Sequence, residues 1–308
     1  MLSYAVRRLL GAVPTLLIIV TVAFFLIRVA PGGPFHLERP LEAQVMENLM
    51  QVYHLDKPLW QQYLLYLQNL FHGDLGPSFV YRDFSVSELF ARGLPVSVQL
   101  GGSALLFALM IGTLLGTLAA LRQNRPADYS VMAVAMIGIT IPNFVMAPVL
   151  TLLFALYLDV LPAGGWGGGS LANKVLPVFT LALPQIAVIA RLTRGSMIEA
   201  LGSNHVRTAR ANGLPGHVVV IVHALRGALL PVVSYLGPAA AALLTGSVVI
   251  ESIFGIPGVG RYFVQGALNR DYTLVMGTVV MIAAFVVVFN LIVDLLYALL
   301  DPKVRYRD

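Results

Sequence analysis

The stretch from Gly202 to Pro231 reads GSNHVRTARANGLPGHVVVIVHALRGALLP, and it decides how the rest of the chain is arranged. It carries Arg207, Arg210 and Arg226, and it lies between two strongly apolar segments. Charged side chains are costly inside a bilayer. We therefore expect this basic stretch to form a loop outside the lipid, where another protein can reach it.

Within this loop the residue types predict a short helix over His205–Asn212. Ser203 or Asn204 is suited to cap its start. Gly213 suits the left-handed position that follows a helix end, and Pro215 prevents continuation. Eight residues span about 12 Å, which is too short to be stable alone. The helix must pack against something.

The two sides of this helix differ in character. Val206 and Ala209 fall on one side, and Arg207 and Arg210 fall three residues apart on the other. The small-residue side is expected to fit a pocket on another protein. The alternative is a basic helix lying on anionic lipid.

Composition places the whole chain in a membrane. Of its 308 residues, 58% are hydrophobic and only 11% are charged, whereas soluble domains carry about 25% charged residues. The chain has no cysteine, which excludes disulfides and thiolate metal sites. The net charge of +5 does not indicate nucleic-acid binding, because the basic residues are dispersed and flank apolar segments.

Hydropathy predicts an all-α protein with six membrane spans. These are Leu9–Ala30, Val96–Leu121, Tyr129–Leu158, Leu176–Ala190, Ala228–Ile250 and Thr273–Leu300. The first is interpreted as an uncleaved anchor that ends at Pro31–Pro34, since it is too long for a signal peptide and no cleavage site follows. Prolines at 142, 177, 184, 231 and 238 indicate helices that bend around a central path, or simple packing kinks.

Charge orients the spans. With both termini inside, the inner segments are rich in arginine, as the positive-inside rule requires. Residues 35–96, which are acidic and soluble in character, then face outward. An amphipathic helix is predicted there over Leu59–Phe71. In the second span, Gly112 and Gly116 permit close helix contact, although the pair can also be tolerated in lipid without such a role.

Motifs for catalysis are missing. Gly164–Ser170 resembles a phosphate loop only faintly and lacks the required lysine. Neither G-x-S-x-G nor H-E-x-x-H occurs. We therefore expect a conduit that is not an enzyme and binds no metal.

Polar residues within the spans are candidates for lining a path. They are Asn143, Gln185, Thr245 and Ser247, and the alternative is helix–helix hydrogen bonding. The apolar, glycine-rich segment 251–260 follows the fifth span. Its residues Glu251, Phe254, Pro257, Gly258 and Gly260 are candidates for an outer gate. The alternative is a tight surface connection.

These segments carry a resemblance. Residues 207–214 (RTARANGL), 223–226 (HALR) and 229–231 (LLP) resemble the coupling loop of the oligopeptide/dipeptide ABC-importer permease family. The broader ABC-importer pattern is met only in part, because Arg207, Thr208, His223 and Arg226 stand where Glu, Ala, Ile and Pro would be. Residues 53–58, 73–78, 251–260, 269–272 and 301–305 are similar to other segments of the family, in the same order. The details ALNRDY and GPSF lean toward the oligopeptide type.

The resemblance implies a type I ABC-importer permease fold with both termini cytoplasmic, in a bacterial cytoplasmic (inner) membrane. Residues 1–30 would form the N-terminus and first helix, 31–95 an extracytoplasmic segment, and 96–308 a five-helix core with the coupling loop at 195–227. The residues that would contact an ATPase are His205, Val206, Arg207, Thr208, Ala209, Arg210, Ala211, Asn212, Gly213 and Leu214.

The implied partners are a second homologous permease subunit in a heterodimer, two ATPase subunits that hold ATP and Mg²⁺, an extracytoplasmic peptide-binding protein, the peptide substrate and the lipid bilayer. No cofactor is expected on this chain. Importers of nickel or murein peptides share the permease type, so the resemblance does not determine which cargo is carried. A secondary transporter or channel, and an intramembrane hydrolase, are the rivals from other classes.

Overall fold

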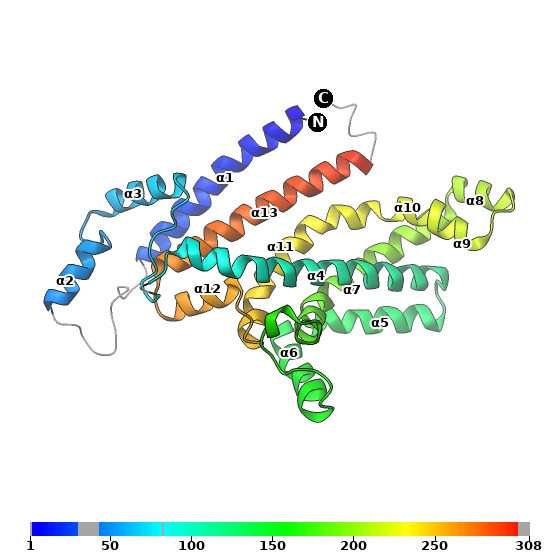
Figure 1. Ribbon diagram of the computed structural model, residues 1–308. Coiled ribbons are helices and arrows are strands. Elements are labelled where there is room, and N and C mark those ends of the chain that lie inside the picture. Colours follow the sequence, from blue (N-terminus) through cyan, green and yellow to red (C-terminus); the bar gives the residue numbers. More distant parts are fainter. Residues whose placement is uncertain (1, 30–42, 82, 301–308) are drawn as a thin grey trace.

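The computed structural model describes residues 2–29, 43–81 and 83–300. These residues are mostly helical and contain no β-strand (Figure 1). The long helices are α1 (Leu2–Val29), α4 (Val86–Leu121), α5 (Pro126–Thr140), α7 (Leu171–Gly202), α11 (Leu230–Ile253) and α13 (Tyr272–Leu300). The shorter helices are α2 (Ala43–Val52), α3 (Leu59–Phe71), α6 (Asn143–Thr151), α8 (Asn204–Ala211), α9 (Gly216–Val218), α10 (Leu225–Ala228) and α12 (Val259–Leu268). Two π-helical turns, η1 (Leu152–Tyr157) and η3 (Val219–Ala224), and one 3₁₀ turn, η2 (Gly167–Gly169), complete the set.

The described helices confirm an all-α membrane protein. Five of them, α1, α4, α7, α11 and α13, are long and apolar enough to cross a bilayer. The pair formed by α5 and the helix from Asn143 to Tyr157 adds a sixth span if it counts as one. The pair bends by 104°, and the break falls at the predicted Pro142.

The two largest differences between the predicted spans and the helices lie at the start of α4 and at the end of α7. The helix α4 begins at Val86, well before the predicted Val96, because Ser85 and Glu88 form a capping box. The helix α7 runs on to Gly202, so the first residues of the predicted coupling loop are helical. Pro177, Pro184 and Pro238 lie inside unbroken helices. The expected stop at Pro31–Pro34 and the matching tail at 301–305 lie outside the described residues.

Glycines allow α4 to pack closely against α7. A Cβ on Gly112 would lie 2.8 Å from the Ile189 side chain, and one on Gly116 would lie 2.4 Å from the Ala190 carbonyl oxygen. Only glycine allows two backbones to approach this closely. The predicted role of this pair in close contact is confirmed, and α4 and α7 together hold the main core.

The outer segment packs on the first and last helices. The helix α3 has the predicted bounds, and its residues Tyr63, Tyr66, Leu67 and Leu70 pack against α1 and α13. Trp60, included in the predicted pattern, is instead exposed. Figure 1 shows α2 and α3 at one end of the bundle and α8 and α9 at the opposite end. The two ends are therefore available for contacts on opposite sides of a membrane.

Candidate coupling site

A single residue joins α7 to α8. Ser203 has extended backbone dihedrals (φ −71°, ψ 155°) and stands between the two helices. Its N–H and its hydroxyl both bond the Ala200 carbonyl, at 3.1 Å and 2.5 Å. The hydroxyl therefore does not cap α8 through a side-chain bond. The helix begins at Asn204, one residue before the predicted start.

The end of α8 is closed by the predicted glycine. Gly213 has φ +76°, and its N–H bonds the Arg210 carbonyl at 3.0 Å. The next N–H, from Leu214, bonds the Ala209 carbonyl at 3.3 Å. This pair of bonds is a Schellman motif, which a left-handed residue makes possible. Nothing lies within 4 Å of a Cβ placed on Gly213, so the requirement for glycine is conformational.

The small-residue side of α8 is buried against its own chain. Val206 (0% exposed) and Ala209 (5%) join a cluster with Ala120 of α4, Met197 of α7 and Val219 of η3. The prediction that this side fits a pocket on another protein is wrong. Burial of these two side chains instead stabilises a helix that is too short to be stable in isolation.

The opposite side of α8 is the free surface. Exposed residues there are His205, Arg207, Thr208, Arg210, Ala211, Asn212, Gly213 and Leu214. The His205 ring lies between the Ser203 hydroxyl (3.0 Å) and the His223 carbonyl oxygen (3.3 Å), which ties α8 to η3. Arg207 and Arg210 make this surface basic, so it is complementary to an acidic partner surface.

An ion pair that the sequence reading missed lies nearby. Arg194 of α7 donates from Nε and Nη2 to the two carboxylate oxygens of Asp128, each at 2.6 Å. Asp128 is only 1% exposed and also accepts from the Asn124 N–H at 2.9 Å. Arg194 precedes Met197 by one turn of α7. The pair therefore holds the α4–α5 turn to the part of α7 that supports α8.

At the outer end, most of the gate candidates converge. Glu251 is fully buried, and its Oε2 accepts from the Gly260 N–H at 2.7 Å. A Cβ on Gly258 would lie 2.3 Å from the same oxygen and 2.6 Å from the Ser97 hydroxyl of α4. These glycines are therefore required so that the backbone can wrap around a buried carboxylate.

The other two gate candidates, Phe254 and Pro257, differ from each other in burial. Phe254 is buried, and its carbonyl accepts from the Gly165 N–H at 2.6 Å. This bond and those from Asn173 to Gly164 and Gly165 hold the 164–170 segment against the 251–260 segment and the start of α7. Pro257 is exposed. The 251–260 segment is thus a packed corner leading into α12, and a gating role stays a prediction.

The path candidates are mainly engaged in packing. Gln185 is buried and accepts from the Tyr235 hydroxyl at 2.8 Å. Ser247 is buried and donates to the Leu244 carbonyl at 2.8 Å. Asn143 has a buried Oδ1 without a partner among the described groups, at the 104° bend. The side chain of Thr245 lies outside the described residues. A hydrogen bond between α7 and α11 explains the buried Gln185. Asn143 Oδ1 accepts no hydrogen bond from the described residues.

Comparisons with known proteins agree with this architecture. Residues 112–306 match the family described as "Binding-protein-dependent transport system inner membrane component", and residues 1–99 match its N-terminal counterpart. A solved structure of the MetNI methionine ABC transporter, in an inward-facing conformation, shares the fold with a TM-score of 0.59 at 17% identity, covering 69% of this chain and 96% of that chain. The fold is that of a type I ABC-importer permease.

The chain belongs to the family of binding-protein-dependent transport system inner membrane components. It is 53% identical over 306 residues to the oligopeptide transport system permease protein OppB of Escherichia coli K12, covering 99% of this chain and 100% of that protein. It is 54% identical to OppB of Haemophilus influenzae, with the same coverage. It is 44% identical to the dipeptide transport system permease protein DppB of Bacillus subtilis, covering 99% and 98%. The predicted family and the multi-pass inner-membrane location are confirmed.

Proposed function

We propose that this chain is the permease subunit of an ATP-driven importer that carries oligopeptides by alternating access. Full-length identity of 53% to an oligopeptide permease carries this proposal. The 44% identity to a dipeptide permease makes shorter peptides the second candidate cargo. Nickel and murein peptides are less favoured, because the matches above name oligopeptide and dipeptide permeases.

The exposed side of α8 contacts an ATPase subunit in this proposal. Its arginines meet an acidic surface, while Val206 and Ala209 anchor the helix to this chain. Movement of the ATPase would then be carried through the shared cluster to the ends of α4 and α7. Those helices are in backbone contact at Gly116, so they are expected to move together. ATP and Mg²⁺ belong to the two ATPase partners, and this chain binds neither.

The remaining partners follow from the same assignment. A second, homologous permease completes the path, and an extracytoplasmic binding protein delivers the peptide. The end of the bundle with α2 and α3 faces outward, and the end with α8 faces the cytoplasm. The arginines of the α8 end support this orientation through the positive-inside rule.

Reconstitution tests the proposal. The four-subunit complex is placed in proteoliposomes with its binding protein, and uptake of labelled peptides of two to five residues is measured with and without ATP. ATP-dependent uptake that favours peptides longer than two residues is expected. Uptake that proceeds without the ATPase subunits would indicate a secondary transporter or channel and contradict the proposal.

A further inference from the structure

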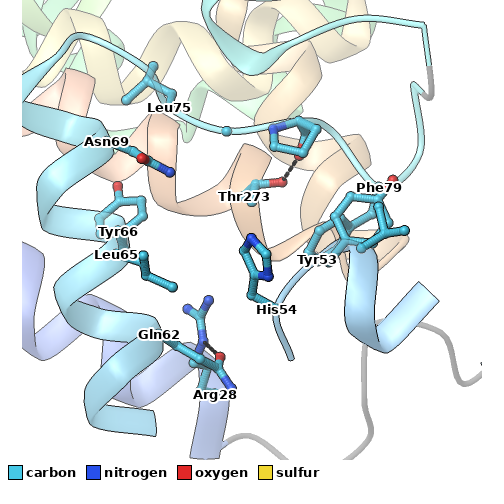
Figure 2. Close-up of a pocket in the computed structure, with 13 residues that line it drawn as sticks. Arg28, Tyr53, His54, Gln62, Leu65, Tyr66, Asn69, Leu75, Phe79 and Thr273 are labelled. Atoms are coloured by element: carbon cyan, nitrogen blue, oxygen red, sulfur yellow. Dashed lines mark hydrogen bonds between the residues drawn. The ribbon is translucent and has the colours of Figure 1, made fainter. Parts of the chain in front are cut away.

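A cavity of about 200 Å³ lies at the end of the bundle opposite α8. Residues 52–54, α3 and the 75–79 turn form most of its wall, together with Arg28 from the end of α1 and Thr273 from α13 (Figure 2). Its wall is mostly apolar, with Val52, Leu65 and Leu75 beside a few polar groups, which is typical of a binding pocket.

The guanidinium of Arg28 is held in one orientation. Its Nε donates to Gln62 Oε1 at 2.9 Å, and its central carbon lies 3.8 Å from the centre of the Phe24 ring. Gln62 is in turn fixed by bonds from its Nε2 to the carbonyls of Lys57 and Leu55. The two terminal nitrogens of Arg28 remain directed toward the cavity, as Figure 2 shows.

This cation has no carboxylate partner among the described residues. Asp271 is already occupied, because it accepts from Ser78, from the N–H groups of residues 79 and 80, and from Thr273 and Leu274. Asp74 accepts from the Gly76 N–H at 2.8 Å. A half-buried arginine is normally paired, so the described part of the chain leaves a pair of donors open to a ligand of the cavity.

A second donor group lines the same wall. The Tyr66 hydroxyl is buried and has no hydrogen-bond partner in the described part of the chain. Burial raises the pKa of Tyr66 to about 12, although Arg28 opposes the shift. The hydroxyl therefore stays protonated at neutral pH and can donate to an anion. His54 and the exposed Asn69 lie around the same space in Figure 2.

We propose that this cavity receives a single aspartate or glutamate side chain from the extracytoplasmic protein that docks on α2 and α3. Arg28 binds the carboxylate through two parallel N–H···O bonds, and Tyr66 donates to it. The volume selects this ligand, because small-molecule sites usually measure about 300–1,000 Å³ and a whole peptide needs more room. Lipid phosphate is less favoured, since a lone guanidinium in an apolar wall is not a cluster of cations. The identity of the partner rests on the proposed function.

Transport kinetics test the docking. In the reconstituted transporter, Arg28→Gln is expected to raise the half-saturating concentration of the binding protein about tenfold, because a charge-assisted bond is lost. The maximal transport rate at saturating binding protein should stay within about twofold of the wild-type rate. Asn69→Asp is nearly isosteric and supplies a competing carboxylate while Arg28 remains, so it should act in the same direction. Arg92→Gln is the matched control: this exposed arginine stacks on Phe84 at 4.6 Å, away from the cavity, and the variant should not change half-saturation.

A binding measurement separates this proposal from the proposed function. Saturation-transfer NMR on the permease in nanodiscs compares the α-methylamides of N-acetylglutamate and N-acetylglutamine, which differ only in the side-chain carboxylate, in zwitterionic and in anionic lipid. Binding of the acid alone, lost in Arg28→Gln and equal in both lipids, is expected. Equal signals from acid and amide, or loss of binding in anionic lipid through headgroup competition, would overturn the carboxylate site. Acid binding without any effect of Arg28→Gln on half-saturation would overturn the docking role, whatever the cargo.

Discussion

Removing either partner of the Asp128–Arg194 pair should destabilise the protein, and the two losses should differ. Asp128 is 1% exposed with Arg194 in place. Arg194→Ala removes two of its three donors and leaves only the Asn124 N–H, and an uncompensated buried charge costs about 3–5 kcal/mol. Asp128→Ala leaves an arginine that is 28% exposed and can regain water. Its cost is therefore smaller, about 1.5–3 kcal/mol, the range of a hydrogen bond to a charged group.

Reversible unfolding in mixed detergent micelles measures these free energies. The double variant should cost less than the sum of the two single variants, with a coupling energy of about 0.5–3 kcal/mol. Coupled ATP hydrolysis in the assembled transporter should fall in both single variants, because the pair supports the segment of α7 below α8. A larger cost for Asp128→Ala than for Arg194→Ala, or costs near zero for both, would refute this reasoning.

Three further predictions follow from the close contacts and the topology. Gly116→Ala should lower the free energy of unfolding by about 1–3 kcal/mol, since its Cβ would meet the α7 backbone, whereas Gly102→Ala points into open space and should cost much less; equal costs would contradict the contact. Gly258→Ala should slow transport by displacing a buried carboxylate, and uptake at the wild-type rate would argue against a role for this corner. In this cysteine-free chain, Gln68→Cys should react with an impermeant thiol reagent in intact cells and Ala211→Cys only after lysis; the reverse pattern would invert the topology.

Local patterns in the sequence were enough to place several elements. The period of Tyr63, Tyr66 and Leu70 gave α3 its bounds, because an amphipathic face follows directly from residue spacing. Gly213 and Pro215 gave the end of α8, because few residue types adopt a left-handed conformation. The Gly112–Gly116 spacing gave the contact face of α4. Each of these features is determined by residues that lie close together in the sequence.

Hydropathy alone misplaced the start of α4. The apolar run begins near Val96, but the helix begins at Val86. The signal was present, because Ser85 and Glu88 have the spacing of a capping box. A helix start is set by such caps, whereas hydropathy reports only the part of a helix that suits lipid.

Contacts between distant segments could not be predicted from the sequence. Nothing in a single chain pairs Asp128 with Arg194, because their approach depends on how α5 packs against α7. The side of α8 that meets the protein's own core was predicted wrongly: the pattern separated Val206 from Arg207, but we expected the small-residue side to face another protein. The packing resolved this by burying the apolar side.

Replacing Gly213 by alanine tests the central claim, that α8 couples an ATPase to transport. Both Gly213 and Gly216 have open space for a Cβ, but only Gly213 has a positive φ. Gly213→Ala should therefore add strain of about 1–2 kcal/mol and tilt α8, while Gly216→Ala is the matched control. The ratio of peptide transported to ATP hydrolysed, measured in proteoliposomes, should fall in Gly213→Ala with assembly intact and stay normal in Gly216→Ala. An unchanged ratio in Gly213→Ala would contradict the coupling role of α8.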